Sequence, residues 1–465
     1  MSVDRDSVFA PALSISGVSA TDGQRIFQIT SSISNMNEPD AMSTTKSAKL
    51  VTYAEHERPA RLTKSLESFS TLRESLTANT RDSLAKYSPW AKALSEANLH
   101  ITVRDEEIGA AADAYQEVAK HLAGNLSWPP EAISILTQGS VSTKTLIRSP
   151  NGGEKFDIDA VCQVDISRIE ATNPMGFFDS IGRALKDLEA EAKRRCWYIH
   201  FSGQPFYLEF TPSVPLDSIP AQTLRSMAPR YSASRYAETA LAVVDTPTKS
   251  WKTSNPAGIR RWVDDTAKRT LIRVPVLEAY SEDLVKASIA PVPDQNVEIT
   301  DTLRVAIRLL KRHRDMSVRR GVIEASSKPI SIIIVTLLTT CYEGLADLNR
   351  SFEHPVELLD ELVALMPHLI LKLDGKYRID NPTIDGENFA EKWNDDDGER
   401  YGSFMTWCDT LSADLKTILA LTDPQAITKR VREVFGIPAP TNGGKTLPTV
   451  QIPGPKATPA SSGLA

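Results

Sequence analysis

The segment from residue 138 to residue 161 constrains the fold of this 465-residue chain more than any other segment does. It contains a Gly-Ser pair, a polar loop and an apolar run that carries Asp157 and Asp159. The apolar run predicts a strand, and strand side chains alternate between two faces, so both aspartates should project from the same face. Two carboxylates placed in this way can bind a divalent metal ion.

The residues before this strand indicate a phosphate site. The apolar residues of 133–136 predict a short strand, which ends just before Gly139 and Ser140. A helix or turn that begins there would present free backbone N–H groups, and such groups suit a phosphate. Each feature alone has an ordinary explanation, because an Asp-x-Asp strand is often a solvated sheet face and a Gly-Ser pair is usually a turn. Their order in one local unit favours a phosphate site beside a metal site.

A third acidic residue, Glu209, lies in the apolar run PFYLEFTPSVP, between Leu208 and Phe210. An unpaired buried carboxylate is costly, so Glu209 needs a partner. That partner is either a metal ion shared with Asp157 and Asp159 or an arginine from elsewhere in the chain. The sequence favours the metal ion.

Several separate stretches together resemble the DNA polymerase β-like nucleotidyltransferases. Within that family they resemble the bacterial CD-NTases of the SMODS type, which are similar to DncV and to animal cyclic GMP-AMP synthase. The stretches are Gly139-Ser140, Asp157-Ile-Asp159, and residues 208–212, 254–262, 309–315, 328–331 and 381–393. The resemblance covers roughly residues 60 to 435. One position departs from the family, in which the third carboxylate is commonly Asp where this chain has Glu209; the longer side chain should still reach a metal ion.

The resemblance implies an α+β fold, with a polymerase β-like nucleotidyltransferase sheet, N-terminal spine helices and a C-terminal helical lobe. The expected organisation is a disordered N-terminal extension, a catalytic lobe, a helical lobe and a disordered Pro-rich tail. These correspond to residues 1–55, 56–290, 291–437 and 438–465.

The same resemblance implies an enzyme that condenses nucleoside triphosphates, with ATP expected among them, into a cyclic di- or trinucleotide messenger for anti-phage (CBASS) defence. Asp157, Asp159 and Glu209 would be the catalytic carboxylates and would hold two Mg²⁺ or Mn²⁺ ions. The residues implied to bind the nucleotide are Gly139, Ser140, Lys311 and Ser331. Two other functions stay open: a transferase that makes linear products or adenylylates a small molecule or protein, and a non-catalytic nucleotide-binding regulator.

From the residues alone, some of these candidates have simpler explanations. Lys311 lies in the last turn of a predicted helix over 301–315, where the helix dipole favours cations. Residues 254–256 either border the nucleotide cleft or form a packing turn. Asn381 and residues 387–393 are interpreted as structural, and Asp395, Asp396 and Asp397 as a solvated turn that binds no metal.

Periodicity predicts further elements along the chain. Helices are expected over 58–99, 105–126 and 177–197, together with a buried helix that starts near Ile330. The closely spaced prolines between Pro212 and Pro256 predict a winding surface segment.

Composition limits the partners. The net charge of −6 argues against a protein that coats nucleic acid, so no DNA partner is expected. Four scattered cysteines without CxxC spacing predict neither a zinc site nor disulfides. The longest apolar run is too short for a bilayer and no signal peptide is visible, so a cytoplasmic location is expected. The Pro-rich tail is either a plain flexible end or, by resemblance to some CD-NTases, a substrate of ubiquitin-like conjugation machinery. A cyclic-nucleotide-activated effector is the expected downstream partner.

Overall fold

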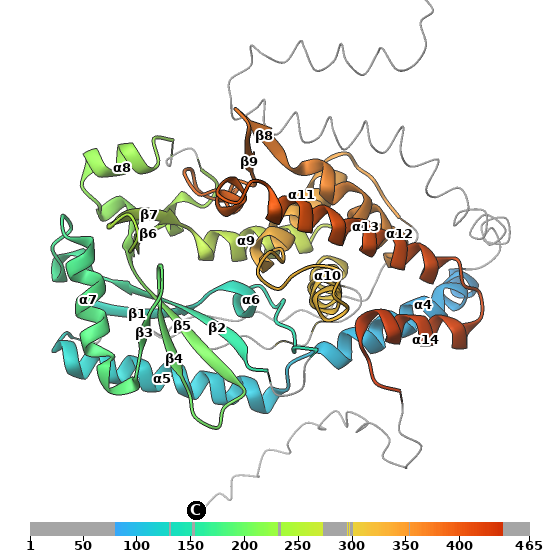
Figure 1. The fold of residues 1–465 in the computed structure, drawn as a ribbon, viewed down its shortest axis with the longest axis horizontal. Helices are drawn as coiled ribbons and strands as arrows, with labels where there is room; N and C mark the ends of the chain where they lie inside the picture. Colours follow the sequence, from blue (N-terminus) through green and yellow to red (C-terminus); the bar gives the residue numbers. More distant parts are fainter. Residues whose placement is uncertain are drawn as a thin grey trace, which may run out of the picture.

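The computed structural model describes residues 80–129, 132–150, 154–230, 234–272, 295, 297, 301–352 and 354–439. The expected N-terminal extension, and the expected tail beyond Ala439, lie outside these residues. In the described part, a mixed sheet with two covering helices adjoins a group of helices (Figure 1).

The main sheet contains seven of the described strands: β1 (Ile133–Thr137), β2 (Phe156–Val164), β3 (Glu191–Ala192), β4 (Trp197–His200), β5 (Phe206–Pro215), β6 (Leu241–Asp245) and β7 (Ser250–Ser254). A separate hairpin contains β8 (Leu371–Leu373) and β9 (Lys376–Arg378). The helices are α4 (Thr80–Ile101), α5 (Asp105–Leu126), α6 (Gly139–Ser142), α7 (Pro174–Ala184), α8 (Ala221–Met227), α9 (Pro256–Ala267), α10 (Thr302–Arg319), α11 (Ser331–Asp347), α12 (Pro355–Leu365), α13 (Glu399–Leu419) and α14 (Pro424–Phe435). The predicted strands around 133–136, 156–161 and Glu209 are confirmed, as is the helix from Ile330. The helix predicted over 301–315 is present but continues to Arg319, so Lys311 lies in its middle and not in its last turn. The expected α+β fold class is confirmed as well.

The main sheet has the order β1-β2-β5-β4-β3, and β6 continues it by pairing with the end of β5 and with β7. Strands β2 and β5 are parallel, and their register places Asp159 beside Glu209. The other pairs are antiparallel. The two central strands therefore carry the acidic residues to neighbouring positions.

One face of the sheet is buried and the other is open. Alternate residues of β2 and β5, such as Ile158, Leu208 and Phe210, are at most 1% exposed and pack with residues of α5 and α7 in one hydrophobic core. Because strand side chains alternate, Asp157, Asp159 and Glu209 project from the opposite face. The hydrophobic contacts thus orient the acidic residues away from the core.

The prolines between Pro212 and Pro256 make a winding surface segment only over residues 216–230 and 234–239, which form short turns and α8 and are mostly exposed or half-buried. The two ends of the segment are strands instead. Strand β5 runs through Pro212 to Pro215, and β6 is buried along its whole length. On one edge, β5 pairs with β4 up to Phe210 and with β6 only from Ser213. Pro212 lies in the gap between these partners, where the backbone N–H that proline lacks is not needed.

The helix predicted over 177–197 is shorter than expected. Helix α7 ends at Ala184, and Trp197 is the first residue of β4. Leu185 and Leu188 continue the helical spacing into a 3₁₀ turn over residues 186–188, after which the chain forms β3. The apolar periodicity therefore extends past the real end of the helix.

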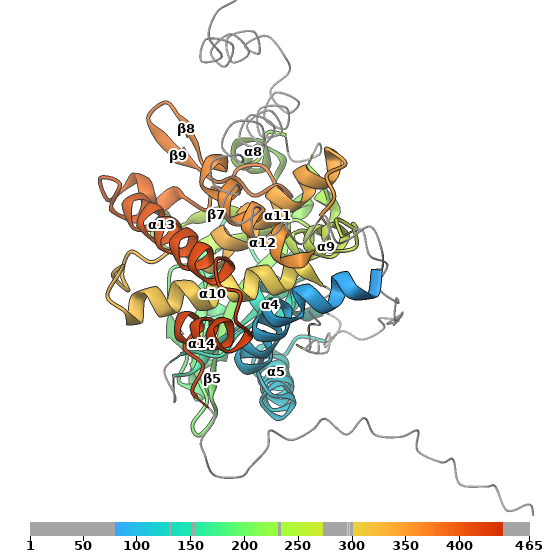
Figure 2. The same ribbon diagram turned by 90° about the vertical axis from the view of Figure 1, so that its right-hand side faces the viewer.

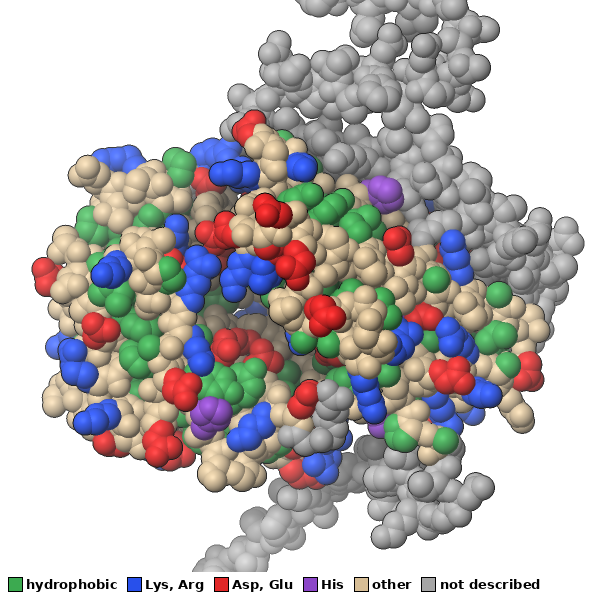
Figure 3. Space-filling model, viewed as in Figure 1, with side chains coloured by type: hydrophobic (Ala, Val, Ile, Leu, Met, Phe, Trp, Pro, Cys, Tyr) green, Lys and Arg blue, Asp and Glu red, His purple; other side chains and the backbone are tan. Residues whose placement is uncertain are grey.

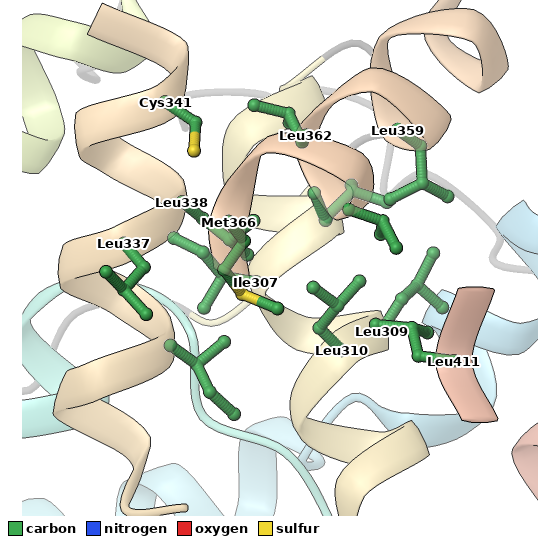
Figure 4. Packing of buried hydrophobic residues seen from close by; sticks show 14 of the residues in the cluster. Ile307, Leu309, Leu310, Leu337, Leu338, Cys341, Leu359, Leu362, Met366 and Leu411 are labelled. Carbon is green, nitrogen blue, oxygen red and sulfur yellow. The ribbon is translucent and has the colours of Figure 1, made fainter. Parts of the chain in front are cut away.

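Helix α10 is the centre of the helical group. It contacts α4, α9, α11, α12, α13 and α14, and these helices surround it in Figure 2. Figure 4 shows Ile307 and Leu310 of α10 facing Leu338 of α11 and Leu362 of α12. Helix α5 covers the sheet as expected of a spine helix, but α4 packs against α10 and α14 instead.

The buried His313 of α10 belongs to a hydrogen-bond network centred on Asp414 of α13. Trp407 Nε1 donates to His313 Nδ1 (3.1 Å), so His313 Nε2 donates to Asp414 (3.0 Å). Arg320 and Arg430 also donate to the Asp414 carboxylate, at 2.8 and 2.7 Å. Burial alone would raise the pKa of Asp414, but the hydrogen bonds from His313 and Arg320 lower it to about 2.

No helix in the described ranges is both long enough and apolar enough to cross a bilayer.

We expect Asp414→Asn to lower the free energy of unfolding by about 2 kcal/mol at pH 7, because it removes the negative charge that accepts hydrogen bonds from buried His313 and from the partly exposed Arg320 and Arg430. Since the pKa of Asp414 is lower in the folded state than in the unfolded state, its contribution is present above about pH 4 and is lost as the pH falls toward 2. Urea unfolding at pH 7 and pH 3 measures both effects. Asp409→Asn, at an exposed position of the same helix, is the control and should change little. Equal stability of the two variants would contradict the assigned role of Asp414.

Candidate active site

A cavity of ≈ 260 Å³ lies between the open face of the sheet and the helical group. One wall comes from α6 and β2, and the other from the start of α9, from α11 and from the loop 381–389. Figure 3 shows a hollow in this face of the molecule, with acidic side chains on its floor and basic side chains along its upper rim. The lining residues include Gly139, Ser140, Asp157, Asp159 and Ser331, which the sequence singled out.

The carboxylates on the open sheet face repel one another. Asp159 and Glu209 are half-buried, whereas Asp157 is exposed. Burial, and then the negative charges of Asp157 and Glu209, raise the pKa of Asp159 well above its usual range. Burial and the charge of Asp157 also raise the pKa of Glu209, which accepts a weak hydrogen bond from Cys196 Sγ (3.8 Å). Such a group of like charges favours the binding of a cation.

The donor chemistry of these residues fits a hard divalent cation. All three provide carboxylate oxygens, which Mg²⁺ and Mn²⁺ prefer. Within the described residues, no hydrogen bond or ion pair reaches the side chain of Asp157 or Asp159, so their lone pairs are available. In the same part of the chain, no three His, Cys, Asp or Glu side chains lie close enough together to hold a metal ion as they stand. An ion would therefore have to draw these carboxylates together.

Gly139 allows α6 to approach Asp159. The backbone N–H of Gln138 donates to the carbonyl of Asp159 (3.0 Å), which fixes the start of α6 against β2. Gly139 has φ +61°, and a Cβ atom there would lie 2.0 Å from Asp159 Oδ2. A side chain at position 139 would therefore require Asp159 to move. The Gly-Ser pair thus places Ser140 and the carboxylate in one cavity.

Basic side chains of α10 hold the loop that follows α6. Arg304 Nε donates to the carbonyl of Thr143 (3.0 Å), and Lys311 Nζ donates to that of Thr145 (2.8 Å). Arg312 Nη1 donates to the carbonyl of Arg148 (3.1 Å). Through these contacts the helical group fixes the position of the loop.

Lys311 itself does not line the cavity. Its ammonium group is buried behind the loop, and burial together with Arg314 lowers its pKa to about 8, against the opposing effect of Asp157. The expected contact of Lys311 with a nucleotide stays a prediction. Ser331, in contrast, lines the cavity, and its hydroxyl accepts a hydrogen bond from Arg314 Nη1 (3.1 Å).

Several lining residues were not expected to belong to the site. Asn381 and residues 387–393 were interpreted as structural, but Asn381, Glu387 and Phe389 all line the cavity. Ser254 and Asn255 line it too, while the Oδ1 of Asn255 accepts from Gly258 N (3.0 Å) and begins α9. Residues 254–256 therefore form a packing turn and also line the cavity. The three acidic residues 395–397 form a turn, as expected.

A second contact joins the sheet to the helical group at the other rim of the cleft. Arg194 and Arg195, from the β3–β4 connection, donate to the buried Asp245 at 2.7 and 3.0 Å. Burial alone would raise the pKa of Asp245, but these hydrogen bonds hold that pKa below its usual range. The same arginines approach Glu391 to within 3.6 and 3.8 Å, and Arg195 lies 4.0 Å from Glu387. Glu391 is half exposed, so these outer ion pairs are in contact with solvent.

Comparisons with known proteins identify the fold. No family model matches the sequence. A curated relative from Roseivirga ehrenbergii, named c-di-GMP synthase, is 25% identical over 309 residues, which are 64% of this chain and 71% of the relative. The solved structure of the Bradyrhizobium diazoefficiens CD-NTase CdnG in complex with GTP matches with a TM-score of 0.51 and 15% identity, covering 77% of this chain and 99% of that one. The chain therefore has the CD-NTase fold, and the resemblance found in the sequence is confirmed.

We expect Gly139→Ala to weaken nucleoside triphosphate binding, because the new methyl group displaces the Asp159 carboxylate. Gly203→Ala is the matched control, since Gly203 also has positive φ (+73°) but a Cβ atom there meets nothing within 4 Å. Both variants should lose about 1–2 kcal/mol of stability from the strained backbone. Calorimetric titration with GTP and ATP in Mg²⁺ should show weaker binding only for Gly139→Ala. Equal binding by both variants would contradict this contact.

Proposed function

We propose that this chain is a nucleotidyltransferase that joins nucleoside triphosphates into a cyclic di- or trinucleotide with release of pyrophosphate. The observation that carries the proposal is that Asp157 and Asp159 line the same cavity as Gly139 and Ser140, while Glu209 lies beside Asp159 on the same sheet face. The name of the Roseivirga relative, c-di-GMP synthase, supports a cyclic product.

The proposal includes two divalent cations. Asp157 and Asp159 would hold both ions, and Glu209 would share one of them. Bound there, Mg²⁺ or Mn²⁺ would lower the pKa of the attacking ribose hydroxyl and neutralise the charge that develops on the leaving pyrophosphate. Burial, and then repulsion between the carboxylates, raise the pKa values of Asp159 and Glu209. These raised pKa values support the assignment, because a bound cation would stabilise the charged form of both groups.

The residues of the chain bind and orient the substrates. Ser140 and the start of α6 would hold the phosphates of the donor nucleotide, and Ser331 on the opposite wall would contact the same phosphate chain. The ribose hydroxyl of the acceptor then attacks the α-phosphorus of the donor. The bond to the bridging oxygen of the β-phosphate breaks, pyrophosphate leaves, and the hydroxyl proton passes to solvent. Correct placement supplies most of the rate enhancement in this kind of reaction.

Ring closure repeats the same step. The linear product keeps a 5′-triphosphate, so it must turn in the cavity until that triphosphate occupies the donor position. A second or third transfer then closes the ring and releases another pyrophosphate. No additional chemical group is required of the protein.

The resemblance to the CD-NTases supports a wider role. We propose that the cyclic product activates an effector in bacterial anti-phage defence, and that the C-terminal tail is a substrate of ubiquitin-like conjugation machinery. The tail beyond Ala439 lies outside the described residues. Deletion of its last residues should abolish conjugation and leave nucleotide synthesis unchanged.

The direct test is to incubate the purified chain with all four nucleoside triphosphates and Mg²⁺, treat the mixture with phosphatase, and analyse it by mass spectrometry. Phosphatase-resistant cyclic species are expected, and chelation of Mg²⁺ with EDTA should abolish them. Products that are only linear or protein-attached would contradict the proposed cyclisation.

We expect Asp157→Asn, Asp159→Asn and Glu209→Gln each to lower the rate of product formation by at least about 100-fold, the order that loss of one preorganised electrostatic group costs. Glu209→Asp should retain part of the activity, because a shorter carboxylate still carries the charge. Asp179→Asn, at an exposed position of α7, is the control. Full activity of Asp157→Asn or Asp159→Asn would remove these residues from the mechanism.

A further inference from the structure

We propose that the Glu387 carboxylate makes the cavity selective for guanine, so that at least one of the joined nucleotides is a guanine nucleotide. The carboxylate would accept hydrogen bonds from guanine N1–H and from the exocyclic amino group. This inference rests on the proposed function, because it takes the cavity as the place where a nucleoside triphosphate binds. It adds the base that the cavity selects.

The two walls of the cavity differ in chemistry. The wall from α6 and β2 presents Ser140, Asp157 and Asp159, which suit phosphates and cations. The opposite wall adds an apolar surface beside its polar residues; the apolar residues are Pro256, Ile259, Ile332, Val335 and Phe389. Aliphatic side chains and an aromatic ring of this kind suit the faces of a nucleobase. The base is therefore expected on the wall that carries Glu387.

Most polar groups on this second wall already bind other parts of the protein. Asn255 Nδ2 donates to the carbonyl of Thr383 (2.8 Å), and its Oδ1 accepts from Gly258 N. Asn381 Oδ1 accepts from Thr383 N (2.9 Å), while its Nδ2 donates to Glu387 Oε2 (2.7 Å). These two amides hold the wall together and have little remaining capacity to bind a base.

Glu387 retains unused acceptor positions. A carboxylate offers about four lone-pair positions, and the hydrogen bond from Asn381 uses one of them. The guanidinium of Arg195 lies 4.0 Å from Oε1, too far for a hydrogen bond. Burial raises the pKa of Glu387 to about 6, against the opposing effects of Asn381 and Arg195, so the group is mainly a carboxylate at neutral pH.

The loop that carries Glu387 is held in one conformation. The backbone N–H of Asn381 donates to the carbonyl of Glu387 (2.9 Å), and Asn388 Oδ1 accepts from the backbone N–H groups of Ile379 and Ala390 (both 2.9 Å). The carboxylate is thus positioned before a ligand arrives, which favours selective binding.

Guanine is the base whose edge matches a carboxylate. Its N1–H and amino group are two adjacent donors, and both find acceptors on one carboxylate. Adenine and cytosine each place a ring acceptor beside their amino group, so that acceptor would face the negative oxygens. Uracil has a single N–H between two carbonyls. A buried polar group left without a partner is costly, so these three bases are disfavoured.

The test is Glu387→Gln, which keeps the size of the side chain but replaces one acceptor oxygen with an amide donor. A glutamine amide matches the donor and acceptor of adenine and mismatches the two donors of guanine. Binding of non-hydrolysable GTP and ATP analogues is measured by calorimetry, and product bases are identified after incubation with equal concentrations of GTP and ATP. The wild-type protein should prefer the GTP analogue at least tenfold. In Glu387→Gln that preference should fall at least tenfold without loss of ATP binding.

Glu391→Gln is the matched control, because Glu391 also approaches Arg195 but does not line the cavity. It should leave the base preference unchanged. Binding of both analogues without preference in the wild-type protein, or an unchanged preference in Glu387→Gln, would overturn this inference alone. A wild-type protein that prefers GTP but forms no cyclic product would overturn the proposed function and leave the guanine assignment supported. Absence of nucleotide binding would overturn both.

Discussion

The hydrogen bonds from α10 to the loop after α6 are the contact on which the site depends. Arg304, Lys311 and Arg312 donate to three carbonyls of that loop. Burying cationic groups is costly unless they are paired, and the loop carbonyls supply that pairing. Helix α10 is in turn fixed by the hydrophobic core that surrounds it. The packing of the helical group therefore sets where Gly139 and Ser140 lie relative to Asp159.

The contacts of α10 with the loop are attractive, whereas the sheet brings together carboxylates that repel one another. Burial of one face of β2 and β5 compels Asp157, Asp159 and Glu209 to share the other face, whatever their charge. The hydrophobic core stabilises this arrangement at the expense of the carboxylates, whose pKa values are raised. Strain of this kind at a functional site is offset by contacts elsewhere in the fold.

Much of this site could be predicted from the sequence, because its central parts depend on local patterns. The alternation around Asp157 and Glu209 predicts their strands, and the order of the motifs predicts the fold. Glu387 and Phe389 could not be identified in this way, since their place depends on a loop that folds back against α9 and α11. Lys311 shows the converse limit: a helix was predicted there, but the helix runs on to Arg319, and only the packing shows that the Lys311 ammonium group lies behind the loop.

The two rims of the cleft respond differently to ionic strength. At the α10 rim the contacts are buried hydrogen bonds, which dissolved salt screens little. At the opposite rim, Arg194 and Arg195 reach the half-exposed Glu391, and such pairs weaken when the Debye length falls below about 8 Å. The cleft thus has one edge whose contacts salt leaves almost unchanged and one edge whose outer ion pairs salt weakens.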